Sequence, residues 1–345
     1  MIIDGRPIGP EHPPYVIAEL SANHNGNIDQ AFAIMEAAKT AGADAIKIQT
    51  YRPDTITIDH HGPEFMIEGG LWDGKWLYDL YEWAHTPWDW HEALFEKARA
   101  LEITLFSSPF DHTAVDLLEG LGAPAFKIAS FELVDLPLIR RVAETGKPMI
   151  MSTGMANDVE IDEALAAARA AGAKDVILLH CVSGYPAPAS DYNLATLRDM
   201  ASRFGVMTGL SDHTLDNTAA IASVGLGAVA IEKHVTLDRT GGGPDDSFSL
   251  EPKELAELVE STRTAWAAVG RVDYGLKSSE VGNIQFRRSL YVVEDIPEGG
   301  ELTAQNIRSI RPGYGLAPKH YDAVLGRRVK LALKRGTALS FDVIE

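Results

Sequence analysis

Short apolar runs of β-strand character alternate with amphipathic helical stretches along the first 270 residues, and eight such pairs can be counted. The helical stretches carry apolar residues at helical spacing, as at Leu165, Ala168 and Ala171, and several end at a glycine such as Gly42 or Gly172. Strands that are apolar on both faces are typical of parallel sheets covered by helices. The pattern therefore predicts an α/β fold, a closed (β/α)8 TIM barrel, with a doubly wound open sheet as the alternative. The predicted strands are 15–20, 45–50, 104–109, 125–130, 148–153, 175–181, 206–212 and 228–234, and the predicted helices are 28–41, 88–100, 113–121, 136–144, 159–171, 192–203, 217–225 and 253–269.

Two segments depart from this repeat. A long insertion, 51–86, rich in Trp, Tyr, His and Gly, follows the second strand, and insertions of this length are usually lids or binding loops. After 270 the repeat stops, and a polar stretch leads into short strands and turns. We therefore expect a catalytic barrel at 1–270, a linker at 271–288 and a small second domain at 289–345.

Composition narrows the classes of function. The net charge of −18 argues against nucleic acid and against an anionic membrane surface as partners. The single cysteine, Cys181, excludes an internal disulfide and reads as a small buried hydrophobe. No apolar stretch is long enough to span a bilayer, and the N-terminus lacks the pattern of a signal peptide. A cytoplasmic protein is the expectation.

Polar side chains stand at the carboxyl end of each predicted strand, which is where barrel enzymes build their active sites. One polar residue closing a strand needs no functional explanation, but a complete ring of them predicts a site. The ring consists of Glu19, Lys47 with Gln49, Ser107 with Ser108, Lys127 with Ser130, Ser152 with Thr153, His180 with Ser183, Asp212 with His213, and Lys233 with His234.

The residue types in this ring indicate particular chemistry. Lys47 and Lys127, with nearby serine hydroxyls, suit a phosphate or carboxylate held by charge-assisted hydrogen bonds. His213 and His234 end adjacent strands and can present two imidazoles to one divalent metal while leaving coordination positions open. Glu19 can reach the same ion or act as a general acid or base. The loop 239–250 is expected to bring Asp245 over the opening above the second histidine.

Ordered motifs connect the chain to a known family. They are AELSANHNG (18–26), ADAIKIQTYRPDT (43–55), FSSPFD (106–111), FKIAS (126–130), STGMA (152–156), LLHCVSGYPAP (178–188), GLSDHT (209–214), IEKH (231–234), GPD (243–245) and IRPGYGL (310–316). With these motifs the whole chain resembles the sialic acid synthase family, in which a barrel is followed by an antifreeze-like (SAF) domain. Within that family, YEWAHTPWDW (81–90) is similar to the branch that makes pseudaminic acid.

The resemblance implies a condensation of phosphoenolpyruvate with an open-chain amino-sugar aldehyde to give a nine-carbon 2-keto acid and phosphate. In the pseudaminic branch the sugar is 2,4-diacetamido-2,4,6-trideoxy-L-altrose. A divalent metal on His213 and His234, Mn²⁺, Mg²⁺ or Co²⁺, would act as a Lewis acid on the aldehyde oxygen and supply the attacking water. The resemblance carries over Glu19 and Glu132 as catalytic residues beside the reacting carbons. The carried-over substrate-binding residues are Lys47, Ser108, Lys127, Ser130 and Ser152 for phosphoenolpyruvate, Ser211 in the same site, and Tyr185, Asp245 and Arg311 for the sugar. Neuraminate synthases commonly have Asn where this chain has Ser183, so no sugar contact is carried over there.

The resemblance also implies a domain-swapped homodimer in which Arg311 of one chain completes the sugar site of the other. An extended linker of 18 residues could span about 60 Å, enough to reach a second subunit. We further expect the Trp and Tyr residues of the insertion to carry sugar selectivity. The alternatives are an N-acetylneuraminate or legionaminate synthase, and a non-catalytic carbohydrate-binding or ice-binding protein. The complete set of two lysines and two histidines argues against the last.

Overall fold

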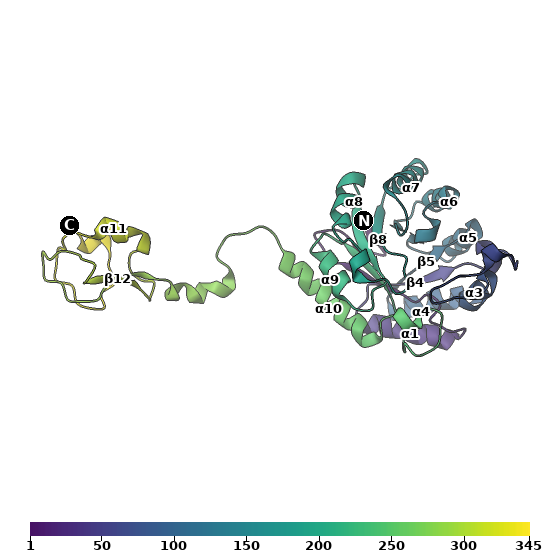
Figure 1. The fold of residues 1–345 in the computed structure, drawn as a ribbon, viewed down its shortest axis with the longest axis horizontal. Coiled ribbons are helices and arrows are strands. Elements are labelled where there is room, and N and C mark those ends of the chain that lie inside the picture. Colours follow the sequence, from purple (N-terminus) through teal and green to yellow (C-terminus); the bar gives the residue numbers. More distant parts are fainter. The chain divides into compact units, whose positions relative to one another are not determined.

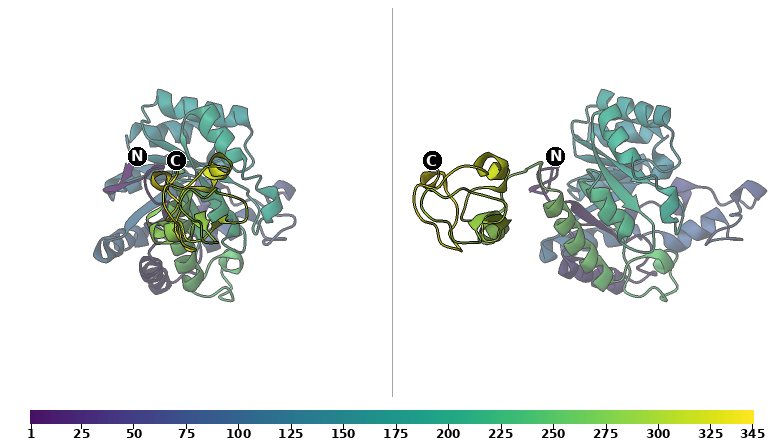
Figure 2. Two further views of the ribbon diagram at one scale, coloured as in Figure 1. Left: turned by 90° about the vertical axis from the view of Figure 1, so that its left-hand side faces the viewer. Right: turned by 60° about the vertical axis from the view of Figure 1, so that its left-hand side comes forward.

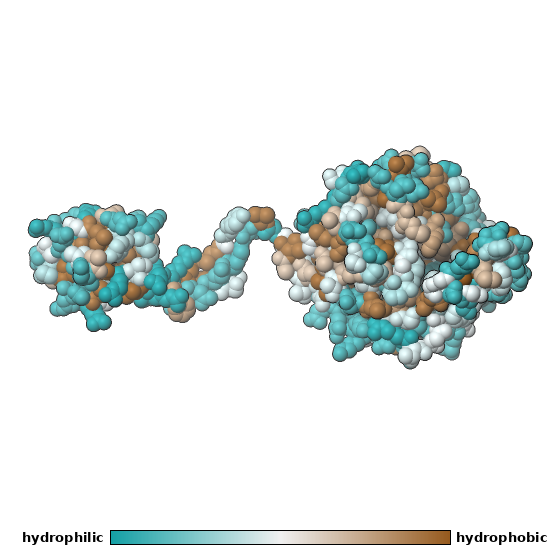
Figure 3. Space-filling model, in the orientation of Figure 1, coloured by the Kyte–Doolittle hydropathy of each residue, from teal (hydrophilic) through white to brown (hydrophobic).

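The computed structural model describes all residues from 1 to 345, and the chain divides into two compact units, Met1–Gly270 and Arg271–Glu345 (Figure 1). The boundary falls where the strand and helix repeat ends in the sequence. No helix in either unit has the length and apolar character needed to cross a membrane. In the orientation drawn, both units present a mostly hydrophilic exterior with scattered hydrophobic patches (Figure 3).

The first unit is a closed barrel of eight parallel strands, so the predicted TIM barrel is confirmed and the open sheet is wrong. The last strand, β10, pairs with the first, β3, and Glu19 lies opposite His234 in that register. Observed strands end up to two residues inside the predicted bounds, as at β6, because Ser130 already belongs to a 3-10 turn. The strands are β3 (Tyr15–Glu19), β4 (Ala45–Thr50), β5 (Thr104–Pro109), β6 (Phe126–Ile128), β7 (Met149–Ser152), β8 (Val176–Cys181), β9 (Met207–Asp212) and β10 (Ala230–His234).

A ring of helices covers the outside of the barrel (Figures 1 and 2). The sequence dictates their ends locally. At α1, for example, the Asn27 side chain accepts a hydrogen bond from the Asp29 amide, and Gly42 ends the helix at φ 86°. The ring consists of α1 (Ile28–Ala41), α4 (His91–Leu101), α5 (His112–Gly120), α6 (Leu136–Glu144), α7 (Asp158–Ala170), α8 (Thr196–Phe204), α9 (Thr218–Val224) and α10 (Pro252–Val269).

Two apolar cores hold the barrel together. The larger lies between strands and helices, and the smaller fills the amino-terminal half of the barrel interior with residues such as Tyr15, Ile17 and Phe106. A short N-terminal hairpin, β1 (Ile2–Ile3) with β2 (Arg6–Pro7), adds Ile3 to the smaller core. Because that end is filled with apolar side chains, the polar site can form only at the carboxyl ends of the strands.

The insertion after β4 is folded rather than an open loop. It contains α2 (Pro53–Ile56), η1 (Pro63–Phe65) and α3 (Leu77–Ala84), followed by η2 (Trp88–Trp90) at the start of α4. Most of its aromatic residues stabilise the insertion itself. The guanidinium of Arg52 lies 4.4 Å from the centre of the Trp88 ring, and His61 stacks on Trp76 at 4.6 Å.

The second unit has its own small core around β11 (Ser289–Val292), β12 (Ile307–Ile310) and α11 (Tyr321–Val324). Short 3-10 turns η7 (Pro318–His320) and η8 (Phe341–Val343) complete it. The predicted extended linker is partly wrong, because its second half forms the 3-10 helix η6 (Ser278–Phe286). A 3-10 helix rises only about 2 Å per residue, so the reach of this segment is well below that of an extended chain.

Candidate active site

A cavity of about 520 Å³ opens at the carboxyl ends of the barrel strands, and every strand or the loop that follows it contributes to its wall. Glu19 and Ser108, both predicted for the site, are fully buried and lie behind the wall rather than on it. Arg311 belongs to the second unit, where it is exposed. The predicted residues that do line the cavity are Lys47, Gln49, Lys127, Ser130, Glu132, Ser152, Tyr185, Ser211, His213, His234 and Asp245.

The alternation of side chains along β10 explains why three titratable residues follow one another there. Glu232 and His234 face the cavity, whereas Lys233 between them points to the other side of the strand. Lys233 Nζ lies 2.8 Å from Oδ2 of Asp212 and 2.6 Å from the carbonyl oxygen of Thr214. The prediction that Lys233 and Asp212 belong to the functional rim is therefore wrong, since they form a buried ion pair outside it.

The same alternation shows that the predicted placement of His180, on β8, in the functional ring is wrong. His180 does not line the cavity, because its Nε2 bonds the carbonyl of Tyr192 on the helix side of the strand. The next residue, Cys181, is buried as predicted but lies on the cavity wall, with its sulfur 3.9 Å from Nδ1 of His213.

Four buried charges form the floor of the site. Lys47 Nζ lies 2.8 Å from Oε2 of Glu19 and 3.6 Å from Oε1 of Glu232, and Lys127 Nζ lies 3.7 Å from the same Glu232 oxygen. Lys47 also donates to Ser108 Oγ at 3.2 Å. The two ammonium groups and two carboxylates balance, which is how a buried charge cluster becomes tolerable. Glu232 is a site residue that the sequence-based assignment missed.

Burial affects the members of this cluster unequally. Burial lowers the pKa of Lys127, and the negative charge of Glu232 offsets this lowering only in part. Burial alone would raise the pKa of Glu232, but Lys127 and Lys47 hold it below its usual range. Glu232 is therefore ionised and occupies the two lysines when no other anion is present.

Two serine hydroxyl groups in this part of the barrel are left without partners. The Oγ atoms of Ser152 and Ser183 are buried and make no hydrogen bond. Ser130 Oγ accepts a hydrogen bond from the Gly154 amide at 3.1 Å, and a side chain at Gly154 would collide with the hydroxyls of Ser130 and Ser183. Ser152 shares the cavity wall with Lys47 and Lys127, and a free hydroxyl donor together with two ammonium groups suits the oxygen atoms of a phosphate or carboxylate.

The two predicted metal-binding histidines face the cavity with ring centres 5.4 Å apart. His213 Nδ1 lies 2.9 Å from the Val182 carbonyl, which can only accept, so Nδ1 carries the hydrogen and Nε2 has a free lone pair. His234 Nδ1 is buried without a hydrogen-bond partner. Burial and the nearby charges of His213 and Lys47 hold the pKa of His234 well below its usual value, which favours the neutral imidazole that binds metals.

These residues fit a divalent metal held by few protein ligands. The structure has no group of three or more His, Cys, Asp or Glu side chains arranged to hold an ion. A cation on the two imidazoles would therefore keep open positions for water and substrate, as catalytic sites require.

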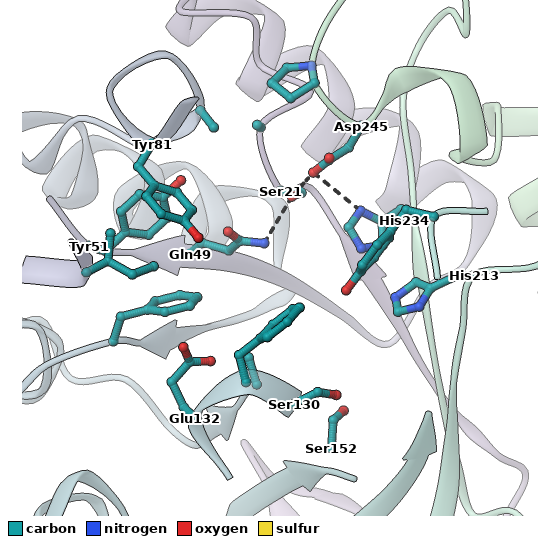
Figure 4. A pocket seen from close by; sticks show the side chains of 18 of the residues that line it. Ser21, Gln49, Tyr51, Tyr81, Ser130, Glu132, Ser152, His213, His234 and Asp245 are labelled. Carbon is teal, nitrogen blue, oxygen red and sulfur yellow. Dashed lines mark hydrogen bonds and ion pairs between the residues drawn. The ribbon is translucent and has the colours of Figure 1, made fainter. Parts of the chain in front are cut away.

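A hydrogen-bonded chain runs along one wall of the cavity (Figure 4). Gln49 Nε2 lies 3.0 Å from Glu19 Oε1 and 3.0 Å from Ser21 Oγ, and the Ser21 hydroxyl donates to Oδ2 of Asp245. Ser21 has φ 48°, a backbone conformation that is uncommon for serine and is often found at functional sites. Ser21 is a second residue that the sequence assignment missed.

Aromatic side chains form the roof. The ring centre of Tyr185 lies 4.4 Å from that of His213 and 5.7 Å from that of Trp72. Trp72, from the insertion, donates its indole N–H to the carbonyl oxygen of Pro244 at 3.1 Å. The insertion and the loop before α10 therefore meet above the cavity, next to Asp245.

Glu132 also lines the cavity (Figure 4). Its Oε2 is buried without a hydrogen-bond partner, and burial raises the pKa of this carboxyl group to about 7. A carboxyl group of this kind can gain or lose a proton near neutral pH, as a general acid or base must.

Together, a closed eight-stranded barrel and a charged cavity at the carboxyl ends of its strands define a TIM-barrel enzyme. Residues 34–274 match the NeuB family and residues 287–345 match the SAF domain. The chain belongs to the NeuB family, with a C-terminal SAF domain, which confirms the resemblance inferred from the motifs.

Relatives match over almost the whole chain. Pseudaminic acid synthase of Helicobacter pylori is 42% identical over 96% of this chain and 98% of its own length. N,N'-diacetyllegionaminic acid synthase of Legionella pneumophila is 32% identical over 99% of this chain and 97% of its own. Among solved structures, the N-acetylneuraminic acid synthetase of Leptospira borgpetersenii in complex with citrate superposes with a TM-score of 0.74 at 31% identity, covering 83% of this chain and 95% of that one.

Proposed function

We propose that this chain is a pseudaminic acid synthase, which condenses phosphoenolpyruvate with 2,4-diacetamido-2,4,6-trideoxy-L-altrose to give a nine-carbon 2-keto acid and phosphate. The observation that carries the proposal is the pattern of identities. Pseudaminic acid synthases of Helicobacter pylori and Campylobacter jejuni are each 42% identical to the chain, whereas two N,N'-diacetyllegionaminic acid synthases are 32% and 36% identical. Human N-acetylneuraminate-9-phosphate synthase is 29% identical.

The polar half of the cavity suits phosphoenolpyruvate. The phosphate and carboxylate groups of phosphoenolpyruvate would bind Lys47, Lys127 and the hydroxyl of Ser152. The two lysines carry the only ammonium groups on the cavity wall, and the Ser152 hydroxyl has no other partner. Glu19, 2.8 Å behind Lys47, orients that ammonium rather than touching substrate. Ser108 supports the same ammonium from behind.

Proton transfer falls to Glu132. In the reaction, C3 of phosphoenolpyruvate bonds to the aldehyde carbon, the aldehyde oxygen takes a proton, water adds to C2, and phosphate leaves with its bridging oxygen. Because Glu132 is partly protonated near pH 7, it can deliver the proton to the aldehyde oxygen and recover one from the water. Tyr185 and Asp245 line the cavity beside the histidines and would orient the sugar, whereas Ser211 donates its hydroxyl hydrogen to Glu232 in the floor.

A divalent cation, Mn²⁺, Mg²⁺ or Co²⁺, held by His213 and His234 would supply Lewis-acid polarisation of the aldehyde oxygen. The protein's part is to orient both imidazoles and, at His234, to favour the neutral ring by holding its pKa well below the usual value. The Val182 carbonyl fixes the ring of His213, and Asp245 stands beside Nδ1 of His234.

We also propose a domain-swapped homodimer in which Arg311 of one subunit completes the sugar site of the other. What supports this is the family resemblance of IRPGYGL, together with exposure of Arg311 and of every residue from 271 to 288. Charged and apolar side chains left exposed in that segment are available to a second subunit.

The function is tested by incubating the purified protein with Mn²⁺, phosphoenolpyruvate and each of three sugars: the diacetamido-L-altrose, its stereoisomer with the manno configuration, and N-acetylmannosamine. Phosphate release and the mass of the product are measured, with sugar-free reactions as the control. We expect phosphate and a nine-carbon acid from the first sugar at the highest kcat/KM. Highest efficiency with either other sugar would instead identify a legionaminate or neuraminate synthase, and no phosphate with any sugar would contradict the enzyme class.

A further inference from the structure

One face of helix α3 is turned toward the cavity. Leu77, Leu80, Tyr81 and Ala84 all line the wall, and their spacing of three, four and seven residues places them on a single side of the helix. Glu82 lies on the opposite, exposed side. The helix was not foreseen in the sequence, and its position makes the insertion a wall of the site rather than a loose cover.

Apolar residues from other segments extend this face. Ile56 from α2, Ile67 and Phe110 also line the cavity. Tyr51 ties the group together, because its ring packs edge-on against Tyr81 at 5.7 Å and against Phe110 at 5.1 Å. We call the group formed by Ile56, Ile67, Leu77, Leu80, Tyr81, Ala84 and Phe110 the α3 annex.

The α3 annex and the two histidines lie on different sides of one cavity, and Glu132 lies on the side of the annex (Figure 4). Figure 4 shows Tyr51 and Tyr81 across the cavity from His213 and His234. None of the annex residues is charged, and the phenol of Tyr81 is its only polar side-chain group. A ligand that extends from the histidines to the α3 annex therefore meets imidazoles at one end and a mainly apolar surface, bordered by Glu132, at the other (Figure 4).

The tryptophan residues of the insertion do not form the α3 annex. Of the five between 51 and 90, only Trp72 lines the cavity. Trp76, Trp83 and Trp88 pack on His61, Lys75 and Arg52 within the insertion. Of the Trp and Tyr residues of the insertion that are expected to carry selectivity, Tyr51, Trp72 and Tyr81 line the cavity, and aliphatic side chains of α3 lie beside them.

We propose that the α3 annex is the subsite for the methyl-bearing end of a 6-deoxy sugar, and that Leu77 and Ala84 determine this specificity. The inference rests on the proposed function, since it places the aldehyde carbon of the sugar toward the histidines and C6 at the far end. A methyl group gains from leaving water there, whereas a hydroxyl group at C6 would lose its hydrogen bonds to water with few replacements. A hydrophobic pocket discriminates against an added hydroxyl by about 10- to 100-fold.

The test compares 2,4-diacetamido-2,4,6-trideoxy-L-altrose with its counterpart that carries a hydroxyl group at C6. The wild-type enzyme should favour the 6-deoxy sugar in kcat/KM by about 10- to 100-fold. Leu77→Asn removes apolar contact and offers the hydroxyl a partner, so the preference should fall by about 10-fold with KM for phosphoenolpyruvate unchanged. Leu77→Met should keep the preference, and Glu82→Gln, on the outer face of the same helix, should change nothing.

Circular dichroism and thermal unfolding establish that each variant is folded, and Ala84→Ser replaces Leu77→Asn if the latter is not. An unchanged preference in a folded Leu77→Asn or Ala84→Ser variant would overturn the proposal, as would equal use of the two sugars by the wild type. The experiment can contradict the proposed subtype and the proposed role of the α3 annex independently. If the manno stereoisomer is the true substrate, the proposed subtype fails, but that sugar is also 6-deoxy and the same comparison with its 6-hydroxy counterpart still tests the annex.

Discussion

The carboxylate of Asp245 lies 3.8 Å from Nδ1 of His234 and is held there by the hydroxyl of Ser21. Ser21 and Asp245 are hydrogen-bonded to each other on the cavity wall although 224 positions separate them in the sequence. The distance of 3.8 Å between Asp245 and Nδ1 of His234 is too long for a hydrogen bond, and Nδ1 has no other partner. A carboxylate that accepts a hydrogen bond from the outer nitrogen of a metal-binding histidine orients the ring and makes it a better ligand, and a small approach of Asp245 would give it this role.

Ser21→Ala should therefore weaken metal binding. Loss of such an orienting partner typically costs 10- to 100-fold in metal affinity, and titration calorimetry with Mn²⁺ measures it without turnover. Ser190→Ala, at an exposed serine of the loop before α8, is the matched control. Unchanged Mn²⁺ affinity alongside a higher KM for the sugar would mean that Asp245 serves the sugar alone.

The metal itself should be required. His213→Ala and His234→Ala should each abolish phosphate release while circular dichroism stays unchanged, because both rings face the cavity rather than the apolar cores. EDTA should have the same effect, reversed by Mn²⁺ or Mg²⁺. His112→Ala, at an exposed histidine, should stay active. Full activity of chelated, metal-free enzyme would exclude the Lewis-acid role.

Lys127→Ala should weaken the binding of phosphoenolpyruvate more than the binding of the sugar. Removing a charge-assisted contact costs about 1.5–3 kcal/mol, or roughly 10- to 150-fold in binding, and Glu232 would lose its partner at 3.7 Å. Steady-state kinetics with each substrate varied in turn gives the two constants, with Lys147→Ala at an exposed position as the control. A large change for the sugar and none for phosphoenolpyruvate would reverse the assignment of the two subsites.

Glu132 should make the fold less stable as the pH rises. Its folded pKa of about 7 exceeds the ordinary value of 4.5, so between these values the unfolded chain loses a proton that the folded protein keeps. Stability therefore falls from about pH 4.5 to pH 7, by about 2–3 kcal/mol, and the loss persists above pH 7.

Glu132→Gln removes this pH-dependent loss of stability, because an amide does not ionise. The variant should unfold at a higher temperature than the wild type at pH 8 and at nearly the same temperature at pH 4.5, with greatly reduced turnover at both. Thermal unfolding monitored by circular dichroism measures the difference, and Glu260→Gln, at an exposed carboxylate of α10, is the control. An equal difference at both pH values would show that the effect is one of packing and not of ionisation.

The sequence predicted those parts of the molecule that have a local signal. Apolar runs located all eight strands, and the polar residues that end them located the site. Strand alternation could have refined this further. If His234 faces the cavity, Glu232 two residues earlier must also face it, and Lys233 cannot.

Other features have no local signal. The bond between Ser21 and Asp245 depends on closure of the barrel, which brings β10 beside β3. Helix α3 lies in a segment whose glycines and aromatic residues resemble an irregular lid, and its apolar face is only two turns long. Tertiary contacts decide both features, so a reading of neighbouring residues could not supply them.

The position of Arg311 leads to a test of subunit cooperation. If the domain is swapped, each sugar site contains His213 from one chain and Arg311 from the other. Arg311→Ala and His213→Ala homodimers would then both be inactive, but a heterodimer would contain one site with both defects and one site with neither. After subunit exchange, equal amounts of the two variants should regain up to about a quarter of wild-type activity, because statistical pairing makes half of the dimers mixed and each mixed dimer has one intact site of two. Phosphate release is followed over time after mixing, and each variant mixed with itself is the control. If the second domain instead serves the barrel of its own chain, every site stays defective and mixing restores no activity.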